Sequence, residues 1–412
     1  MTKLEVMNSS ASITLHEPIT LETISQEIIN CRKDLIPSKS RIAFVFMTEH
    51  FFAMAEDILE SVRVDGHAGT VVGCSGSGVL GTNTEIEQSP SFSLLMMNLP
   101  QGCEFNTFRY NQEFIENQTS SEEWFEKIGK KKGDQSKFVV FSDPFTVDSL
   151  AWMKSWNAAL DHSPTTGGLA SGNMGNRQSR IFLNGQSFSE GGVGLHLSGG
   201  LEIHTVVSQG CIPIGKSHII TKAEQNIIFE LGGRPAYEVL SETVDSLNDE
   251  LKNRAQGNLF IGFVMNEYKE KFKRGDFLVR NLLGADQAMG ALAVGEWPHV
   301  GQTIQFQLRD SKTAHEDLEH WLEEKKSELK GKQILSGLMF VCNGRGKNLF
   351  KEGNHDAKTV AKFFGDIPLA GFFCNGEIGP VGKSNFLHGY TASLALFVES
   401  SDPAATASTQ SK

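Results

Sequence analysis

The feature that most constrains the fold of this chain is a pattern of segments that occurs three times. Each copy starts with a short apolar run that predicts a buried strand and continues with a predicted helix. A glycine-rich turn follows about 30 residues later, and then another apolar strand. The first strands and their turns are residues 42–46 with 73–78, residues 138–141 with 167–172, and residues 338–342 with 368–376. Because the copies are scattered along the chain, duplicated α/β domains explain them better than a solenoid does.

These repeats predict an α/β fold of two related halves, each a mixed sheet flanked by helices and built from strand–helix–strand–turn–strand units. Residues 259–265 with 290–301 are a weaker candidate for a fourth unit. The expected parts are an N-terminal extension with one helix (1–40), two domains (41–235 and 236–399), and a disordered tail (400–412).

The charge and cysteine content narrow the classes of partner. The net charge is −11, and an acidic chain without a long basic run is a poor candidate for nucleic-acid binding. Six cysteines without a CxxC pair, and dispersed histidines, favour neither a disulfide scaffold nor a metal site, and no cofactor is expected. The first 20 residues do not resemble a signal peptide, and no apolar run is long enough to span a membrane. We therefore expect a cytoplasmic protein.

A second pattern, at residues 210–217 (GCIPIGKS), matches the nucleotide-binding expression GxxxxGK[ST]. A phosphate-binding loop must open onto a helix whose amides hold the phosphates. Here β-branched runs on both sides of a polar turn predict a hairpin, and Pro213 lacks an amide hydrogen. We therefore discount a phosphate-binding loop.

The repeated turns predict a shared pocket, because each combines backbone amides with a small polar side chain at a strand end. In this interpretation Arg345 holds a ligand carboxylate by a bidentate contact. The predicted ligand-binding residues are Cys74, Ser75, Ser77, Cys342, Asn343, Arg345, Asn375 and Glu377. The alternative is a scaffold whose glycines serve the turns alone.

An enzymatic alternative is a cysteine-dependent activity on a small metabolite, by acyl or thiol chemistry. Cys342 precedes Arg345, whose charge could lower the pKa of a nearby thiol, and His355 and His388 supply imidazoles in the same region. Cys374 is the second candidate nucleophile. Both cysteines can equally be small buried apolar residues, so no catalytic residue is assigned.

Several blocks of the sequence resemble the FIST family (F-box and intracellular signal transduction proteins). The resemblance covers roughly residues 40–398. Its most specific blocks are residues 212–215, 233–236, 277–281, 301–310, 342–346, 371–380 and 386–393. It implies a FIST N-terminal and a FIST C-terminal domain, and a sensory module that binds small ligands such as amino acids and signals through a protein partner. Residues 1–40 lack the helical pattern of an F-box, which distinguishes this chain from the ubiquitin-ligase adaptors of the family.

Overall fold

The computed structural model describes residues 8–17, 19–38, 41–130, 135–160, 163–172, 175 and 177–400. Apart from Ser400, the predicted tail at 400–412 lies outside the described residues. The chain divides into two compact units. The first contains residues up to Val207 and from Trp321 onward, and the second contains Ser208–His320.

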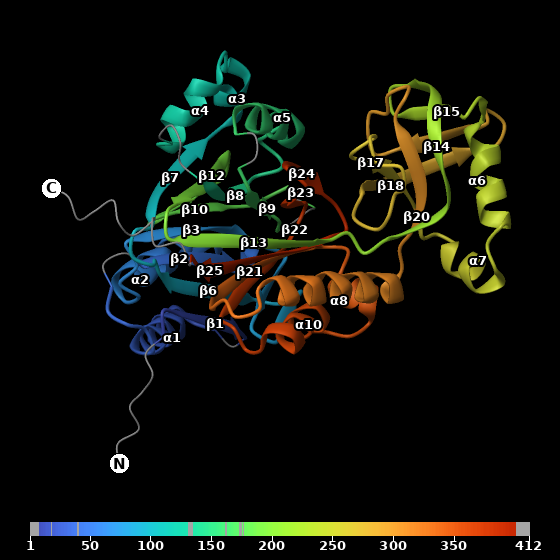
Figure 1. Cartoon of the computed structure of the whole chain (residues 1–412). Helices are drawn as coiled ribbons and strands as arrows, with labels where there is room; N and C mark the ends of the chain where they lie inside the picture. Colours follow the sequence, from blue (N-terminus) through green and yellow to red (C-terminus); the bar gives the residue numbers. More distant parts are fainter. Residues whose placement is uncertain are drawn as a thin grey trace. The chain divides into compact units, whose positions relative to one another are not determined.

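The described residues of the first unit (Figure 1) form three six-stranded mixed sheets. The strands follow the same order in each sheet. The first sheet runs β1 (Ser10–His16), β6 (Ser91–Asn98), β2 (Arg41–Met47), β3 (Thr70–Ser75), β10 (Ile181–Leu183), β11 (Gln186–Phe188). The second runs β7 (Glu104–Tyr110), β12 (Gly192–Ser198), β8 (Lys137–Ser142), β9 (Thr165–Leu169), β23 (Glu377–Val381), β24 (Ser384–His388). The third runs β13 (Leu201–Ser208), β25 (Ala392–Glu399), β21 (Ile334–Cys342), β22 (Leu369–Cys374), β4 (Gly78–Gly81), β5 (Thr84–Glu87).

The three predicted repeats pair in the same way. In each, the two strands joined by a helix are parallel, as in β2–β3, β8–β9 and β21–β22. The last strand of each repeat pairs antiparallel with the first. The hairpin between them leaves its own sheet: β4–β5 joins the third sheet, β10–β11 the first, and β23–β24 the second. The three sheets thus exchange hairpins in a closed cycle.

One glycine in each repeat allows the parallel strands to approach. A Cβ atom on Gly73, Gly167 or Gly371 would lie 1.8 Å from the carbonyl oxygen of Val45, Val140 or Met339, respectively. Each of these residues is the register partner of its glycine. The glycines are therefore required by the strand pairing itself.

Apolar residues on the inner faces of the three sheets form one core. Phe46, Phe141 and Phe340 occupy the same position in the three repeats, and their ring centroids lie 5.4 to 6.4 Å apart. Phe372 of β22 stacks on Phe46 with a centroid distance of 5.0 Å. This cluster of rings joins the three sheets into one compact body.

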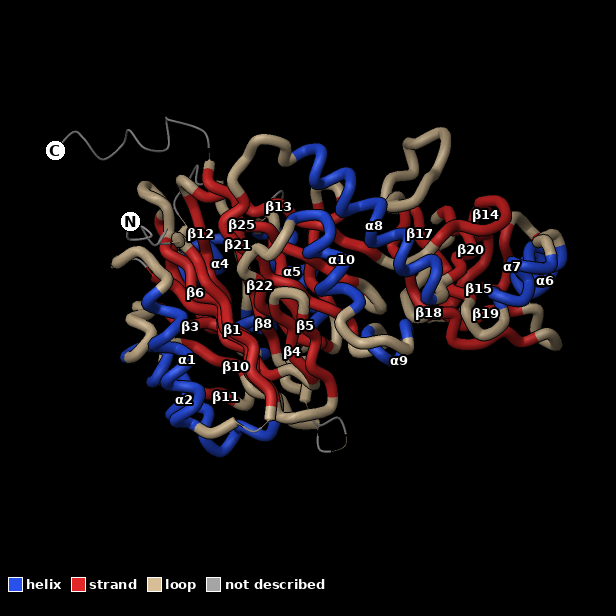
Figure 2. Tube along the Cα trace, turned by 90° about the horizontal axis from the view of Figure 1, so that it is seen from below, coloured by secondary structure: helices blue, strands red, loops and turns tan. Residues whose placement is uncertain are grey.

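Helices cover the outer faces of the first two sheets. The one helix predicted within residues 1–40 is α1 (Leu21–Lys33), which begins after the Thr20 cap. It packs beside α2 (Ala55–Val64), which follows the 3₁₀ turn η1 (Glu49–Met54) (Figure 2). α3 (Gln112–Asn117), α4 (Ser121–Ile128) and α5 (Ser149–Ala159) bury three tryptophans, 124, 152 and 156, against the second sheet. α10 (His355–Phe364) follows the short α9 (Gly346–Phe350) and contacts β5.

The second unit is a closed six-stranded β-barrel rather than a second α/β half. The strand order is β14 (Ile212–Glu224), β20 (Thr303–Leu308), β17 (Leu259–Val264), β18 (Phe277–Asp286), β19 (Ala291–Val294) and β15 (Ile227–Leu231), and β15 pairs back with β14. The unit also contains the edge strand β16 (Arg234–Pro235) and the helices α6 (Ala236–Asp245) and α7 (Asp249–Ala255). The helix α8 (Ser311–Glu328) begins in this unit.

The expected fourth repeat is therefore wrong. Both neighbours of β17 run antiparallel to it, whereas the first two strands of every true repeat are parallel. The prediction of two related halves becomes three related repeats and one barrel, within a mixed α/β fold. Among the described helices, none is long and apolar enough to cross a membrane.

Candidate functional site

The three glycine turns meet where the second strand of each repeat ends. The backbone amide of Ser77 in the first turn donates to Ser171 Oγ in the second, at 2.7 Å. Asn375 Nδ2 in the third turn donates to the carbonyl oxygen of Ala170 in the second, at 3.0 Å. Each of the three turns therefore contacts another, as the predicted convergence requires.

Three polar side chains form a row at this junction, which we call the polar row: Ser77, Asn343 and Asn375. Ser77 Oγ donates to Asn343 Oδ1 at 2.7 Å, and Asn343 Nδ2 donates to Asn375 Oδ1 at 2.8 Å. Asn343 follows β21 directly, and its backbone amide donates to Cys374 O at 3.1 Å. All three side chains are half-buried, so they combine fixed positions with partial access to solvent.

Three of the other predicted site residues lie inside the protein. Cys74 belongs to the core between the sheets, and burial raises the pKa of its thiol well above the ordinary value. Ser75 is buried and donates from Oγ to Ser171 O at 2.6 Å. Glu377 is fully buried, accepts from the Thr391 amide at 3.0 Å, and accepts from Cys374 Sγ at 3.0 Å. These buried residues therefore stabilise the turns and are not exposed to a ligand.

Arg345 has a buried partner that the sequence interpretation did not assign to it. Its Nε and Nη2 atoms donate to the two carboxylate oxygens of Asp356 at 2.7 and 2.8 Å, and both side chains are 0% exposed. The edge of the guanidinium that we expected to hold a ligand carboxylate is therefore occupied by a carboxylate of the chain itself. Burial alone would raise the pKa of Asp356, but the charge of Arg345 holds it below its ordinary value.

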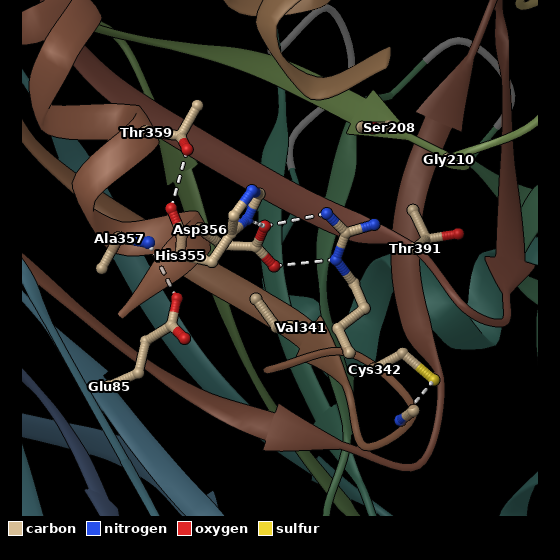
Figure 3. Close-up of polar contacts among 12 residues, drawn as sticks. Glu85, Ser208, Gly210, Val341, Cys342, His355, Asp356, Ala357, Thr359 and Thr391 are labelled. Carbon is tan, nitrogen blue, oxygen red and sulfur yellow. Dashed lines mark hydrogen bonds and ion pairs between the residues drawn. The ribbon is translucent and has the colours of Figure 1, made fainter. Parts of the chain in front are cut away.

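Two further residues complete this buried cluster. His355 Nδ1 lies 2.9 Å from Asp356 Oδ1, and its ring stacks on Phe350 at a centroid distance of 3.4 Å. Glu85 of the exchanged hairpin accepts from the Ala357 amide through Oε1 at 2.8 Å (Figure 3). Its Oε2 has no hydrogen-bond partner within the described part of the chain. Burial, and then the charge of Asp356, raise the pKa of Glu85 to about 8.

Glu85 was missed because nothing in the sequence near it indicates burial. It lies on a short polar strand, TEIE, whose alternation is typical of a half-exposed hairpin. Only the transfer of this hairpin to the third sheet brings it to α10. The sequence indicated Asp356 only as a possible cap of the following helix, and not as the partner of Arg345.

The two candidate nucleophiles differ in their surroundings. Cys374 is fully buried, and burial together with the neighbouring Glu377 carboxylate raises the pKa of its thiol well above the ordinary value. Cys342 is half-buried, and its Sγ accepts from the Gly344 amide at 3.5 Å (Figure 3). Each candidate base has a hydrogen-bond partner: His355 Nδ1 contacts Asp356, and His388 Nε2 contacts the carbonyl oxygen of Gly379 at 3.1 Å.

The segment that matches the phosphate-binding expression lies largely in strand β14, which forms a hairpin with β15. The segment continues as this strand to Glu224 and does not open onto a helix, and the amide of Gly210 donates to a carboxylate, Asp317 Oδ2, at 2.9 Å. The discounting of this pattern is therefore consistent with the structure.

Comparison with known proteins shows the family to which this chain is similar and several related proteins. The FIST N domain matches residues 41–234 and the FIST C domain residues 236–380. An uncharacterized protein of Mycobacterium tuberculosis is 34% identical over 382 residues, covering 93% of this chain and 97% of that protein. One of Mycobacterium bovis is 36% identical over 345 residues, covering 84% and 87%. F-box only protein 22 of Homo sapiens is 38% identical over 76 residues, covering 15% of this chain and 19% of that protein.

Proposed function

Because the chain belongs to the FIST family, we propose that it is a non-enzymatic signal-transduction protein that binds a small polar ligand at the polar row. Amino acids are the first ligand class to test. A protein partner would carry the signal onward, and the cytoplasm is the expected compartment.

The observation that carries this proposal is the position of Ser77, Asn343 and Asn375 at the meeting point of three turns. Amide side chains both donate and accept, so they suit the mixed ammonium and carboxylate groups of an amino acid. The hydrogen bonds between the turns hold these side chains in place before a ligand arrives, which reduces the entropy lost on binding.

In this proposal Arg345 positions the loop and does not contact the ligand. Its bidentate bond to Asp356 fixes the start of α10 relative to the segment that carries Asn343. The ligand contacts therefore come from the polar row and from neighbouring backbone amides, and Glu377, Cys74 and Ser75 act as buried supports.

The test is a thermal-shift screen of the full chain against the twenty amino acids, followed by calorimetry on any that stabilise it. We expect Asn343→Ala to abolish the shift. Asn117→Ala, on the exposed face of α3, is the matched control and should keep it. An equal ligand shift in Asn343→Ala and the wild type would reject the polar row as the site.

A cysteine-dependent enzyme is the second candidate function. Its nucleophile would be Cys342, which is half-buried beside the polar row, and not the fully buried Cys374. Labelling with iodoacetamide between pH 6 and pH 9 separates the two functions. Rapid labelling of Cys342 with a midpoint well below the ordinary thiol pKa of about 8.5 would support the enzyme. Slow labelling with the ordinary midpoint would argue against it.

A further inference from the structure

A cavity far from the polar row along the chain has a basic lining that the proposed function does not use. It measures about 610 Å³ and is lined by the end of α1, the segment after it, the first residue of β2 and the loop before β3. We call it the basic cavity. Its lining includes Arg32, Lys33, Leu35, Pro37, Arg41 and His67.

Arg41 is the central observation, because it is a buried cation that forms no ion pair with a carboxylate of the described residues. Its side chain is 2% exposed, and its three nitrogen atoms donate to Asn98 Oδ1, Gly66 O and Ile36 O at 2.8 to 2.9 Å. All three acceptors are neutral. No carboxylate among the described residues forms an ion pair with it, although buried charges in proteins are ordinarily paired.

The other charged side chains in the lining of the cavity, Arg32 and Lys33, add positive charge. Arg32 lines the same cavity, and burial followed by the charge of Arg32 lowers the pKa of Arg41. Arg32 Nη1 lies 2.8 Å from His67 Nε2. Since a guanidinium only donates, His67 Nε2 is the acceptor in this contact.

The helix dipole explains part of this arrangement but not all of it. Arg32 and Lys33 lie in the last turn of α1, where cations interact favourably with the helix C-terminus. Arg41 belongs to a strand, and its burial beside a second guanidinium is unfavourable for the empty protein. An anion in the cavity would provide the missing negative charge.

We propose that the basic cavity is a binding site for a small phosphate-bearing molecule. Guanidinium groups attract phosphate through their charge, and two of them line the cavity. The nitrogen atoms of Arg41 already donate to protein oxygens, so its contribution is its uncompensated charge. Its volume falls in the range of small-molecule sites and exceeds the need of an isolated phosphate ion. Leu35 and Pro37 provide an apolar wall for the organic part of the ligand.

The test uses calorimetry on the full chain with inorganic phosphate, AMP, adenosine and citrate. We expect AMP and phosphate to bind, adenosine not to bind, and citrate to bind more weakly than AMP. The double variant Arg32→Gln/Lys33→Gln should weaken AMP binding at least about tenfold, since it removes two charges from the lining. The control Arg63→Gln/Lys154→Gln removes the same charge from the surfaces of α2 and α5 and should bind as the wild type does.

Hydrogen exchange on addition of AMP locates the site independently, and protection is expected in residues 32–38 and 65–69. Protection confined to other segments would overturn the assignment, as would an absence of binding or equal affinity in the double variant. Citrate binding as tight as AMP binding would overturn the phosphate class. Arg41→Lys, which keeps the charge, should still bind AMP, and its melting temperature without ligand reports whether it still folds.

Discussion

Arg345 and Asp356 form a fully buried ion pair, and this burial determines how the region responds to substitution. Each charge is stable in the interior only because the other is in contact with it. A pair of this kind contributes little when compared with apolar residues, but loss of one partner leaves an uncompensated buried charge. The role of Arg345 is therefore tested by measuring the stability of its variants as well as their ligand affinity.

We expect Arg345→Met to lower the free energy of unfolding by about 3–5 kcal/mol, because it strands the Asp356 carboxylate. Urea denaturation followed by circular dichroism measures this change. Arg63→Gln, which removes the surface pair with Glu60, should cost at most about 1 kcal/mol. If Arg345→Met cost no more than Arg63→Gln, the pair would not hold the loop.

Glu85 gives the same region a pH dependence of defined sign. Its pKa of about 8 in the folded chain exceeds the unfolded value near 4.3. Between these values the folded state binds more protons than the unfolded state, so this group stabilises the fold below the unfolded pKa. That stability is lost as the pH rises through about 8.

We therefore expect the wild type to lose stability from pH 5.5 to pH 8.5 relative to Glu85→Gln, whose side chain does not titrate. The measurement is the urea midpoint of both proteins at each pH. Parallel curves for the two proteins would show that Glu85 does not titrate in this range.

At this scale the sequence predicted which residues gather but not which of them are accessible. Ser77 and Asn375 were found from the shared turn pattern, because equivalent positions in repeats take equivalent places, whereas Asn343 was found in the block at residues 342–346. The burial of Arg345 and Glu377 and the partner role of Glu85 depend on contacts between distant segments, which no local pattern records.

The elements of the first unit are held together by exchange of hairpins among the three sheets. Each hairpin supplies the edge pair of a neighbouring sheet, so no repeat completes a six-stranded sheet with its own strands. The sequence predicted the strands, helices and turns of each repeat from periodicity and glycine position. It could not predict the exchange, because a hairpin has the same local pattern whichever sheet it joins.

A glycine substitution tests the close approach of the parallel strands. In Gly371→Ala the new Cβ would lie 1.8 Å from Met339 O, so β21 and β22 must separate, and we expect a loss of about 3 kcal/mol or more. Gly389→Ala is the matched control, since no atom lies within 4 Å of its Cβ position. Melting temperatures compare the two variants, and similar values would refute the strand-pairing requirement.

Over the whole molecule, chain order shows that the barrel is an insertion into the third repeat. An outer strand precedes each repeat: β1, β7 and β13. α1 separates β1 from β2, and α3 with α4 separates β7 from β8, whereas residues 209–333, which include the barrel strands and α8, separate β13 from β21. The prediction of two related halves missed this insertion because local sequence patterns do not record which strands pair, and the described pairs of the inserted strands are antiparallel.

The buried apolar residues of the barrel form a cluster drawn from residues 208–320 alone. We therefore expect Phe306→Ala, which truncates a fully buried barrel side chain, to destabilise the barrel by about 3–5 kcal/mol. Hydrogen exchange should then accelerate in β14, β17 and β20 and remain unchanged in β8 and β12. Phe340→Ala, in the core of the three sheets, should give the reverse pattern. Equal acceleration in both groups of strands, for either variant, would show that the chain unfolds as one cooperative body, and that the inserted barrel shares its stability with the repeats that surround it in sequence.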